Sequence, residues 1–351
     1  MIIPSTYAVT LLLTIVTMIC WGSWANTTKL AGRWRFELFY FDYSFGVLLA
    51  AAIAALTFGS LGDDLSVLDN LSIVGRRPIF YGFLGGVVFN LANILLVAAI
   101  TVAGLAVAFP IGIGLALVIG VVWNYFLNPQ ANPSLLFTGA GIVVAAIIVD
   151  AIAYGQHGAS KAAAPPPPHA HPKGPGKPAP PKRSPAKGIL LSLVSGLLMG
   201  TFYPLVEISK RGEIGLGPYS VGLVFSVGVF LSTFFFNLYF MNLPVQGPPT
   251  TFAAYFKGTR KQHLLGIAGG LIWCIGTISN FAASSAPKEV NVGPAVSYAL
   301  GQGATAISAL WGLLYWKEFA GATSRVKGML WLMMILFVAG LVLVSVAPLF
   351  K

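Results

Sequence analysis

The sequence is most unusual in what it lacks: residues 78–149, a run of 72, contain no Asp, Glu, Lys, Arg or His. Over the whole chain of 351 residues, 9% are charged and 56% are hydrophobic, whereas about a quarter of the residues in soluble globular domains are charged. The mean hydropathy is +0.81. A chain with so little charge cannot cover its surface with well-hydrated groups, so the composition predicts a protein embedded in lipid.

Other absences argue against whole classes of protein. The two cysteines, Cys20 and Cys274, both fall in apolar runs, so the sequence holds no disulfide framework or zinc pattern. The stretch from Gly174 to Lys177 is too short for the phosphate-binding loop of an ATP-driven transporter. The predicted spans contain no histidine, no zinc-protease or serine-hydrolase motif, and no charged ring or filter repeat. An enzyme, a receptor or a channel is therefore not favoured, and no cofactor or metal is expected.

Apolar runs long enough to cross a bilayer occur ten times. A span needs about 20 mostly apolar residues, because in lipid each backbone N–H and C=O must be paired inside a helix. We therefore predict an all-α integral membrane protein with ten transmembrane helices. The predicted spans are 5–29, 40–60, 78–99, 102–124, 134–154, 188–208, 217–240, 264–285, 290–316 and 328–349.

The two halves of the chain share motifs in the same order, which indicates an internal duplication. Each half holds five spans, an odd number, so the second half would cross the membrane in the opposite direction, as in many transporters. We predict two five-helix inverted repeats, 1–154 and 188–351, joined by a linker at 155–187. The matched motifs are Gly22-Ser23-Trp24 with Gly200-Thr201-Phe202, Tyr43-Ser44-x-Gly46 with Tyr219-Ser220-x-Gly222, and Gly82, Gly85, Gly86 and Pro110 with Gly266, Gly269, Gly270 and Pro294, the last set 184 residues later.

Basic residues and the linker predict the orientation in the membrane. Residues 155–187 include ten prolines and six Lys or Arg, a composition that forms no packed core. Cytoplasmic loops are enriched in Lys and Arg, and the side that carries the linker holds all but six of the 21 in the chain. We expect a multi-pass protein of the plasma or inner membrane with a cytoplasmic linker and both termini outside. Orientation explains the net charge of +11, so no nucleic-acid partner is expected.

Prolines and a short connection are predicted to shape the helices. Only Ile100 and Thr101 separate the third and fourth predicted spans, which indicates a tight hairpin. Proline lacks a backbone N–H and disrupts a helix interior. Pro110 and Pro294 are therefore predicted to interrupt their helices and free a carbonyl, which lipid tolerates only where protein or a wet cavity covers it.

Polar and aromatic side chains inside the spans are the candidates for substrate binding. Amides offer paired donors and acceptors and aromatic rings offer flat faces, which suits a ureide, a nucleobase or a sugar. Hydrogen bonding between helices is the competing role, and we expect it for at least half of the set. The candidates are Trp24, Asn26, Tyr43, Asn90, Asn93, Tyr203, Trp273, Asn280, Tyr298 and Gln302, on spans that meet between the two halves.

Acidic residues in or near the spans are the candidates for proton coupling, because burying a charge in the membrane is unfavourable and such residues are usually functional. Asp42 and Glu207 are the two candidates. Asp42 is also expected to form an ion pair with Lys29 across a short loop. Asp150, at the end of a predicted span beside the linker, is interpreted as a solvated residue.

Short motifs along the chain occur in a combination found in one family. They are 41–51 with 55–59, 85–87 with Asn93, 104–106, 118–120 with 124–127, 243–248 with 252–255, 269–273, and 310–312 with 317–318. Together they resemble the plant ureide permease family, within the drug/metabolite transporter superfamily and near the bacterial glucose/ribose porters. The resemblance implies ten spans and proton-coupled import of allantoin, uracil and related oxo-purines.

The function predicted from these observations is secondary active transport. The expected activity is import of a small neutral polar metabolite, driven by protons or another coupling ion, in a lipid bilayer. Export of a metabolite or drug on the same fold is the alternative, because residues do not reveal the direction of transport. The substrate and the oligomeric state, including a homodimer, stay open.

Overall fold

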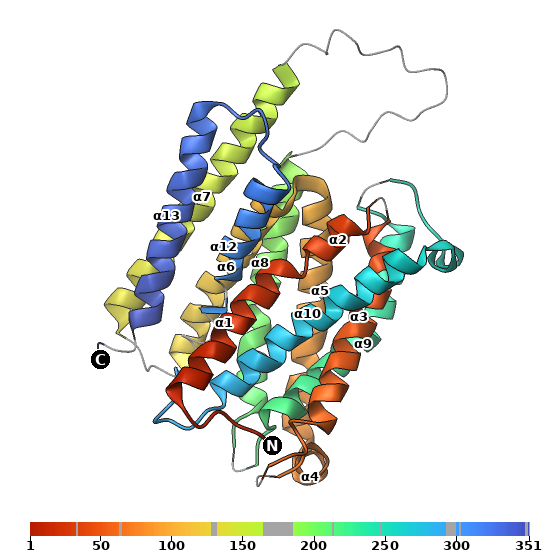
Figure 1. Ribbon diagram of the computed structural model, residues 1–351, viewed down its shortest axis with the longest axis vertical. Coiled ribbons are helices and arrows are strands. Elements are labelled where there is room, and N and C mark those ends of the chain that lie inside the picture. Colours follow the sequence, from red (N-terminus) through yellow and green to blue (C-terminus); the bar gives the residue numbers. More distant parts are fainter. Residues whose placement is uncertain are drawn as a thin grey trace.

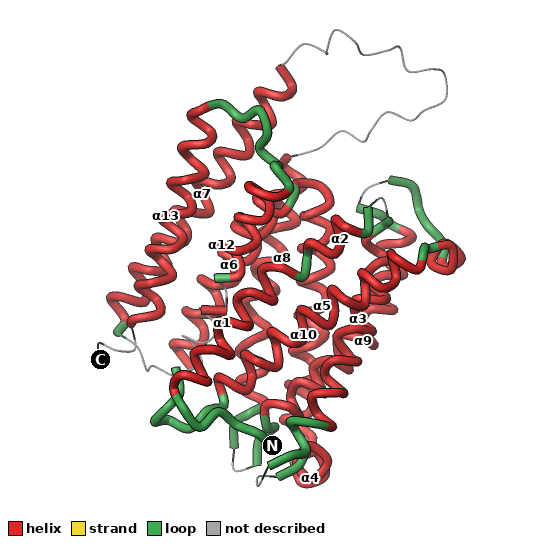
Figure 2. The backbone as a smooth tube through the Cα atoms, in the orientation of Figure 1, coloured by secondary structure: helices red, strands yellow, loops and turns green. Residues whose placement is uncertain are grey.

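The protein is a bundle of long helices. The computed structural model describes residues 1–32, 34–62, 65–127, 132–163, 185–212, 214–245, 247–292, 300–301, 303–347 and 350. Within these ranges every regular element is helical, and loops join the helices mainly at the two ends of the bundle (Figure 2). Nine of the described helical segments are long and apolar enough to cross a membrane.

The described residues of the first half form seven helices. Short helices α2 and α4 accompany five long ones. Their bounds are α1 Tyr7–Ser23, α2 Asn26–Leu30, α3 Phe36–Leu56, α4 Val67–Ile73, α5 Arg76–Ala103, α6 Leu105–Leu127 and α7 Pro133–Ala163.

The second half begins with α8 and ends with α13. The short elements are the 3-10 helix η1 and the π-helical turn η2, which continues α12 directly. The bounds are α8 Pro185–Ser209, α9 Pro218–Asn242, η1 Phe252–Lys257, α10 Arg260–Ser284, α12 Ala304–Leu310, η2 Trp311–Tyr315 and α13 Ser324–Val346.

Two predicted boundaries move because local backbone chemistry sets them. Helices α5 and α6 are separated by Gly104 alone, whose φ of 96° lies in a region that glycine adopts readily. The chain therefore turns at Gly104, and α5 continues through Ile100 and Thr101, where the sequence had predicted the turn. Helix α10 begins earlier than predicted because Thr259 and Gln262 form a capping box at its start.

The prediction that Pro110 interrupts its helix was wrong. Helix α6 runs without a break across Pro110 from Leu105 to Leu127. One proline removes a single hydrogen bond to the residue four positions earlier, Ala106. Packing of α6 against α7 and α8 holds the helix across that point. Pro294 lies outside the described residues.

The predicted linker is partly helical. Helix α7 extends to Ala163 and α8 starts at Pro185, so both ends of the stretch 155–187 belong to long helices, and 164–184 lie outside the described residues. The extension is held by packing, since His157 is buried and its ring lies 5.0 Å from that of Phe319.

The ninth predicted span is shorter in the described structure. The described part of 290–316 forms one apolar helical segment, Ala304–Tyr315, while 293–299 and Gln302 lie outside the described residues. The described residues therefore provide nine helices that could cross a membrane, one fewer than the ten predicted.

The helices pack across the two halves of the chain. Helix α5 contacts α8 and α9, helix α10 contacts α1 and α3, and α7 packs with α13. Figure 1 shows α7 and α13 side by side at one edge of the bundle, with both chain ends at the lower end. The end of α7 and the start of α8 lie at the upper end, which we call the linker end.

Candidate substrate site and coupling residues

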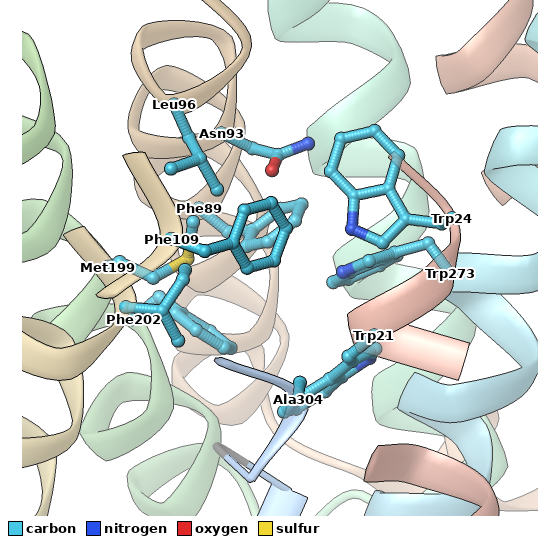
Figure 3. Close-up of a pocket in the computed structure, with 11 residues that line it drawn as sticks. Trp21, Trp24, Phe89, Asn93, Leu96, Phe109, Met199, Phe202, Trp273 and Ala304 are labelled. Carbon is cyan, nitrogen blue, oxygen red and sulfur yellow. The ribbon is translucent and has the colours of Figure 1, made fainter. Parts of the chain in front are cut away.

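A small cavity lies in the centre of the bundle, and aromatic side chains surround it (Figure 3). Its walls come from both halves of the chain: α1, α5 and α6 of the first half and α8, α10 and α12 of the second. The lining residues are Trp21, Trp24, Phe89, Asn93, Leu96, Phe109, Ile113, Met199, Phe202, Trp273 and Ala304.

A break in the first helix places Trp24 at this cavity. Helix α1 ends at Ser23 and α2 starts at Asn26, and the hydroxyl of Thr27 donates to the Trp24 carbonyl at 2.7 Å. That hydroxyl partly replaces the hydrogen bonding that an unbroken helix would provide to the backbone. Interrupted helices at the centre of a bundle are typical of transporter binding sites.

Asn93 is the amide of the cavity, and two tyrosines fix its orientation. Its Nδ2 donates to the hydroxyl of Tyr40 at 3.0 Å and to that of Tyr43 at 3.1 Å. Both amide hydrogens are thereby used, and within the described residues the amide oxygen accepts no hydrogen bond. Figure 3 shows the amide between Leu96 and Trp24, above the rings. The two hydrogen bonds thereby fix the orientation of the amide oxygen, an acceptor.

Trp24 and Trp273 add flat faces and N–H donors. The rings of Trp273 and Phe89 are stacked with centroids 4.2 Å apart, and Trp24 packs against Tyr43 at 4.8 Å. Within the described part of the chain, neither indole N–H of these two tryptophans donates a hydrogen bond, and both nitrogens lie on the inner side of the ring of side chains in Figure 3.

The cavity is narrow in this conformation. Its volume is about 30 Å³, enough for a water molecule or two and too small for a metabolite. Away from the linker end, α1 and α10 touch directly, since Thr17 Oγ1 donates to the Gly276 carbonyl at 2.9 Å and Trp21 Nε1 to Thr277 Oγ1 at 3.1 Å. A ligand can enter only after the rings separate.

A much larger cavity, which we call the vestibule, opens at the linker end. Its volume is about 1020 Å³. Thr28 and Ile100 line it, four residues beyond Trp24 and Leu96 of the central cavity. Leu96 and Ile100 both lie in α5, where four residues advance by about 6 Å, so the two cavities are neighbours. The other lining residues are Lys29, Gly32, Trp34, Phe36, Phe39, Thr101–Gly104, Tyr154, Gly155, His157, Gly158, Trp316, Glu318 and Phe319.

Glu318 connects several segments in the wall of the vestibule. Its carboxylate accepts hydrogen bonds from the backbone N–H of Leu105 at 3.0 Å and of Ala106 at 2.7 Å, at the start of α6. A negative side chain at a helix N-terminus pairs with N–H groups that have no partner inside the helix. Gly104 and Gly312 leave room for this carboxylate, since an added Cβ would lie 3.0 and 2.8 Å from it.

Lys29 pairs with Glu318, so the predicted pairing of Lys29 with Asp42 was wrong. The Lys29 ammonium forms an ion pair with Glu318 and lies 5.0 Å from the centre of the Trp316 ring. The break after α1 turns α2 toward the segment that follows η2, and Trp316 Nε1 donates to Asn26 at 2.6 Å. This cluster links the first half of the chain to the second at the vestibule.

Removing Glu318 is expected to destabilise the vestibule wall. E318A leaves two backbone N–H groups and Lys29 without this partner, and a hydrogen bond to a charged group contributes about 1.5–3 kcal/mol. We expect a lower thermal midpoint for E318A and a smaller decrease for E318Q, measured on purified protein in detergent. E289Q, at an exposed position, is the matched control; an equal midpoint for E318A and E289Q would contradict this role.

Asp42 lies in a separate polar cluster near the linker end. Its carboxylate accepts from the Tyr255 hydroxyl at 2.6 Å and contacts His263 Nδ1 at 2.8 Å. The Trp34 ring lies 4.8 Å from that of His263. Burial, the hydrogen bond to Asp42 and the charge of Asp42 raise the pKa of Tyr255 above its ordinary value, so this hydroxyl remains a donor at neutral pH.

Glu207 has a fixed local partner. The Lys210 ammonium lies 3.0 Å from its carboxylate and also donates to the Ser284 hydroxyl at 2.8 Å. These contacts lie at the end of the bundle opposite the vestibule, where α8 ends at Ser209. Glu207 does not line the central cavity.

The interpretation of Asp150 as a solvated end residue was wrong. Helix α7 continues to Ala163, so Asp150 lies well inside it, with 0% of its surface exposed. Neither carboxylate oxygen has a hydrogen-bond partner among the described residues. An ionised Asp at the centre of a membrane helix is unfavourable by about 2.5–3.5 kcal/mol on insertion scales, so this surrounding favours the neutral acid.

The other predicted binding residues that the structure describes do not line the central cavity. Asn90 bonds between helices, donating to Ser232 at 2.8 Å and to Thr233 at 3.1 Å. Tyr203 and Asn280 are buried but do not line the cavity. Tyr298 and Gln302 lie outside the described residues. Of the ten predicted binding residues, the structure therefore brings Trp24, Asn93 and Trp273 to the cavity, with Tyr43 behind Asn93.

Sequence reasoning missed three polar residues of these clusters. His263 was left outside its span because the predicted start of that helix was 264, although the Thr259–Gln262 capping box was a readable signal. Tyr255 and Glu318 lie in connecting segments, and their partners, Asp42 and the start of α6, are more than 200 residues away. Contacts at that separation leave no local pattern.

Comparisons with known proteins agree with the motifs. Residues 39–164, from α3 to the end of α7, match the family model described as Ureide permease. Ureide permease 2 of Arabidopsis thaliana is 23% identical over 93% of this chain and 93% of its own length. Probable ureide permease A3 of Vigna unguiculata is 32% identical over 40% of this chain and 39% of its own length. These findings support a relation to the ureide permease family, whose members are named as permeases and not as enzymes.

A solved crystal structure shares the fold. It aligns over 97% of this chain and 96% of its own length with a TM-score of 0.56 and 18% identity. Identity at this level supports the arrangement of helices alone. With the apolar helices and the permease relatives, it supports a multi-pass membrane protein.

Proposed function

We propose that this protein is a secondary transporter that imports a small neutral polar metabolite, and that the central cavity is its binding site. The relatives named ureide permeases support transport of a small solute. The aromatic cavity between the two halves of the bundle supports the position of the site. Its substrate-binding residues would be Trp24, Asn93 and Trp273, with Tyr43 as support.

The observation that carries the proposal is the fixed donor and acceptor set of this cavity. Asn93 presents a carbonyl oxygen, and Trp24 and Trp273 present N–H groups beside flat ring faces. A planar solute with its own N–H and C=O groups satisfies all three and stacks on the rings. This chemistry favours a ureide or a nucleobase over a sugar, whose hydroxyls project from a puckered ring.

An inverted-repeat arrangement is part of the proposal, and the helix contacts support it. If α1, α3, α5, α6 and α7 correspond to α8, α9, α10, α12 and α13, the most extensive helix contacts recur with the halves exchanged. Helix α5 packs on α8 as α10 packs on α1, and α3 packs on α10 as α9 packs on α5. Matched glycines follow this pattern, since a Cβ at Gly86 would meet the Phe225 carbonyl and one at Gly270 that of Tyr43.

The recurrence of helix contacts between the two halves is consistent with alternating access. Two halves related in this way can rock against each other around a central site. The described conformation has a wide vestibule at the linker end and direct helix contact on the other side. With the linker in the cytoplasm, as the basic residues predict, this state would face inward with a narrow binding site. A tenth span, the domain limits and placement in the wider drug/metabolite transporter superfamily belong to the same proposal.

Uptake by the purified full-length chain in liposomes tests the function. We expect allantoin or uracil to raise the thermal midpoint and to accumulate when a proton gradient is imposed, and glucose, ribose and rhamnose to do neither. A ligand at 100 times its dissociation constant stabilises by about 2.7 kcal/mol, a readily measured shift. Transport only out of the compartment equivalent to the cytoplasm would support the exporter instead. Stabilisation and transport by sugars alone would contradict the substrate class.

A further inference from the structure

One buried acid has no role in the site described above. Asp150 is fully buried in α7, and neither of its oxygens is hydrogen bonded within the described residues. Buried polar groups in proteins nearly always have partners, and an exception calls for an explanation. An acid of this kind inside a membrane helix is usually functional.

Asp150 lies next to the vestibule. Tyr154 and His157 are four and seven residues further along α7, so they share its face of the helix, and both line the vestibule. Phe319, the residue after Glu318, places its ring 5.0 Å from that of His157, so the segment that carries Glu318 lies against this face of α7. Asp150 is therefore about one helical turn, roughly 6 Å along the axis, below a large cavity.

The other elements packed near Asp150 bring no further acid or base to it. Helix α6 has one titratable residue, Tyr125, at its far end, and α13 has Arg325 and Lys327, both exposed at its start. Helix α8 carries Lys187 in its first turn and Tyr203 and Glu207 in its final turns. Tyr154, His157 and Glu318 are thus the titratable groups that face Asp150 from the described elements packed around it.

The carboxylate of Asp150 has no described hydrogen-bond partner, whereas those of Asp42 and Glu207, the two acids predicted to couple protons, have partners. Asp42 is held by Tyr255 and His263, and Glu207 by Lys210. Those partners provide hydrogen bonds or an ion pair to the carboxylate oxygens. Around Asp150 no such partner is described, so its neutral form suits this conformation and its ionised form does not.

We propose that Asp150 is a proton-binding site, and that its protonation is coupled to the Glu318 and Lys29 pair at the vestibule. The proposal rests on the transport function proposed above. Binding forms one O–H bond between a carboxylate oxygen and a proton from solution, and the charge changes from −1 to zero. The neutral acid leaves Glu318 undisturbed on Lys29 and the start of α6. Release of the proton returns it to solution and places a second negative charge beside Glu318, which weakens that cluster and favours the other conformation.

Infrared spectroscopy of the purified full-length chain in lipid tests proton binding without a substrate. We expect the carbonyl stretch of a protonated carboxylic acid at neutral pH, shifted in heavy water. The band should be lost in D150N and retained in D69N, D42N and E207Q. If D150N fails to fold, E318Q serves as the second variant, because removing the neighbouring charge should shift the Asp150 band. Absence of the band in the wild type, or its persistence in D150N, would overturn the proposal.

Transport assays in proteoliposomes test the coupling. With labelled allantoin and uracil as probes, D150N should keep exchange across the membrane and lose accumulation driven by a proton gradient, whereas D69N should keep both. Full accumulation in D150N would reject the coupling, and its loss in D42N or E207Q but not in D150N would assign it to one of those residues. If the wild type transports neither probe, the proposed function fails, while the infrared result still decides whether Asp150 holds a proton.

Discussion

Replacing Asn93 by Leu is expected to abolish most uptake of the transported solute while the protein still folds. The variant removes the only amide of the described cavity wall, and a ligand N–H would then be buried without a partner. An unsatisfied buried group costs about 1–3 kcal/mol, which corresponds to a loss of roughly tenfold or more in kcat/KM. Initial rates of uptake in proteoliposomes over a range of substrate concentrations measure this loss.

Asn90 provides the matched control for Asn93. It lies on the same helix three residues earlier, is equally buried, and bonds to Ser232 and Thr233 on α9 instead of facing the cavity. N90L and N93L each remove hydrogen bonds between helices, so we expect similar decreases in thermal midpoint. Only N93L should lower kcat/KM strongly. Equal loss of uptake in both variants would mean that Asn93 acts through packing and would reject the cavity as the binding site.

Adding one methyl group at Gly270 is expected to prevent normal folding. A Cβ there would lie 2.0 Å from the Tyr43 carbonyl oxygen and 2.7 Å from the Val47 backbone nitrogen. Both are backbone atoms, which cannot rotate away as a side chain can, so α10 and α3 must separate. Overpacking usually costs about 1–3 kcal/mol, and we expect G270A to reach or exceed the upper value. Yield and thermal midpoint in detergent are the measurements.

A Gly-to-Ala change at a glycine with free space around it distinguishes the effect of steric crowding from the effect of helix propensity. Gly141 lies in α7, and a Cβ there would meet no atom within 4 Å. Alanine is a better helix former than glycine by about 1 kcal/mol, so G141A should be neutral or slightly stabilising. G86A should behave like G270A, since its Cβ would lie 2.1 Å from the Phe225 carbonyl oxygen. A normal midpoint for both G86A and G270A would contradict the close helix packing.

Local patterns in the sequence were enough to predict the helices. Lipid forces the backbone to pair within each helix, so a long apolar run such as 78–99 is already a helix, and the structure places α5 over it. The matched Gly86 and Gly270 lie where two helix backbones approach closely, because a residue without a side chain leaves room for such contact. These features depend on residues close together in the chain.

Tertiary structure alone decided which polar residues meet. Asn90 and Asn93 are the same residue type on one helix, only about 60° apart around its axis, yet Asn90 bonds to α9 while Asn93 bonds to α3 and lines the cavity, because the neighbouring helices differ at those two positions. Glu318 joins the start of α6 across more than 200 residues. Asp150 was misread because the apolar pattern fades near the linker while α7 continues through packing. Helix formation in lipid is local, whereas the partner of a polar side chain depends on how the helices rotate and cross.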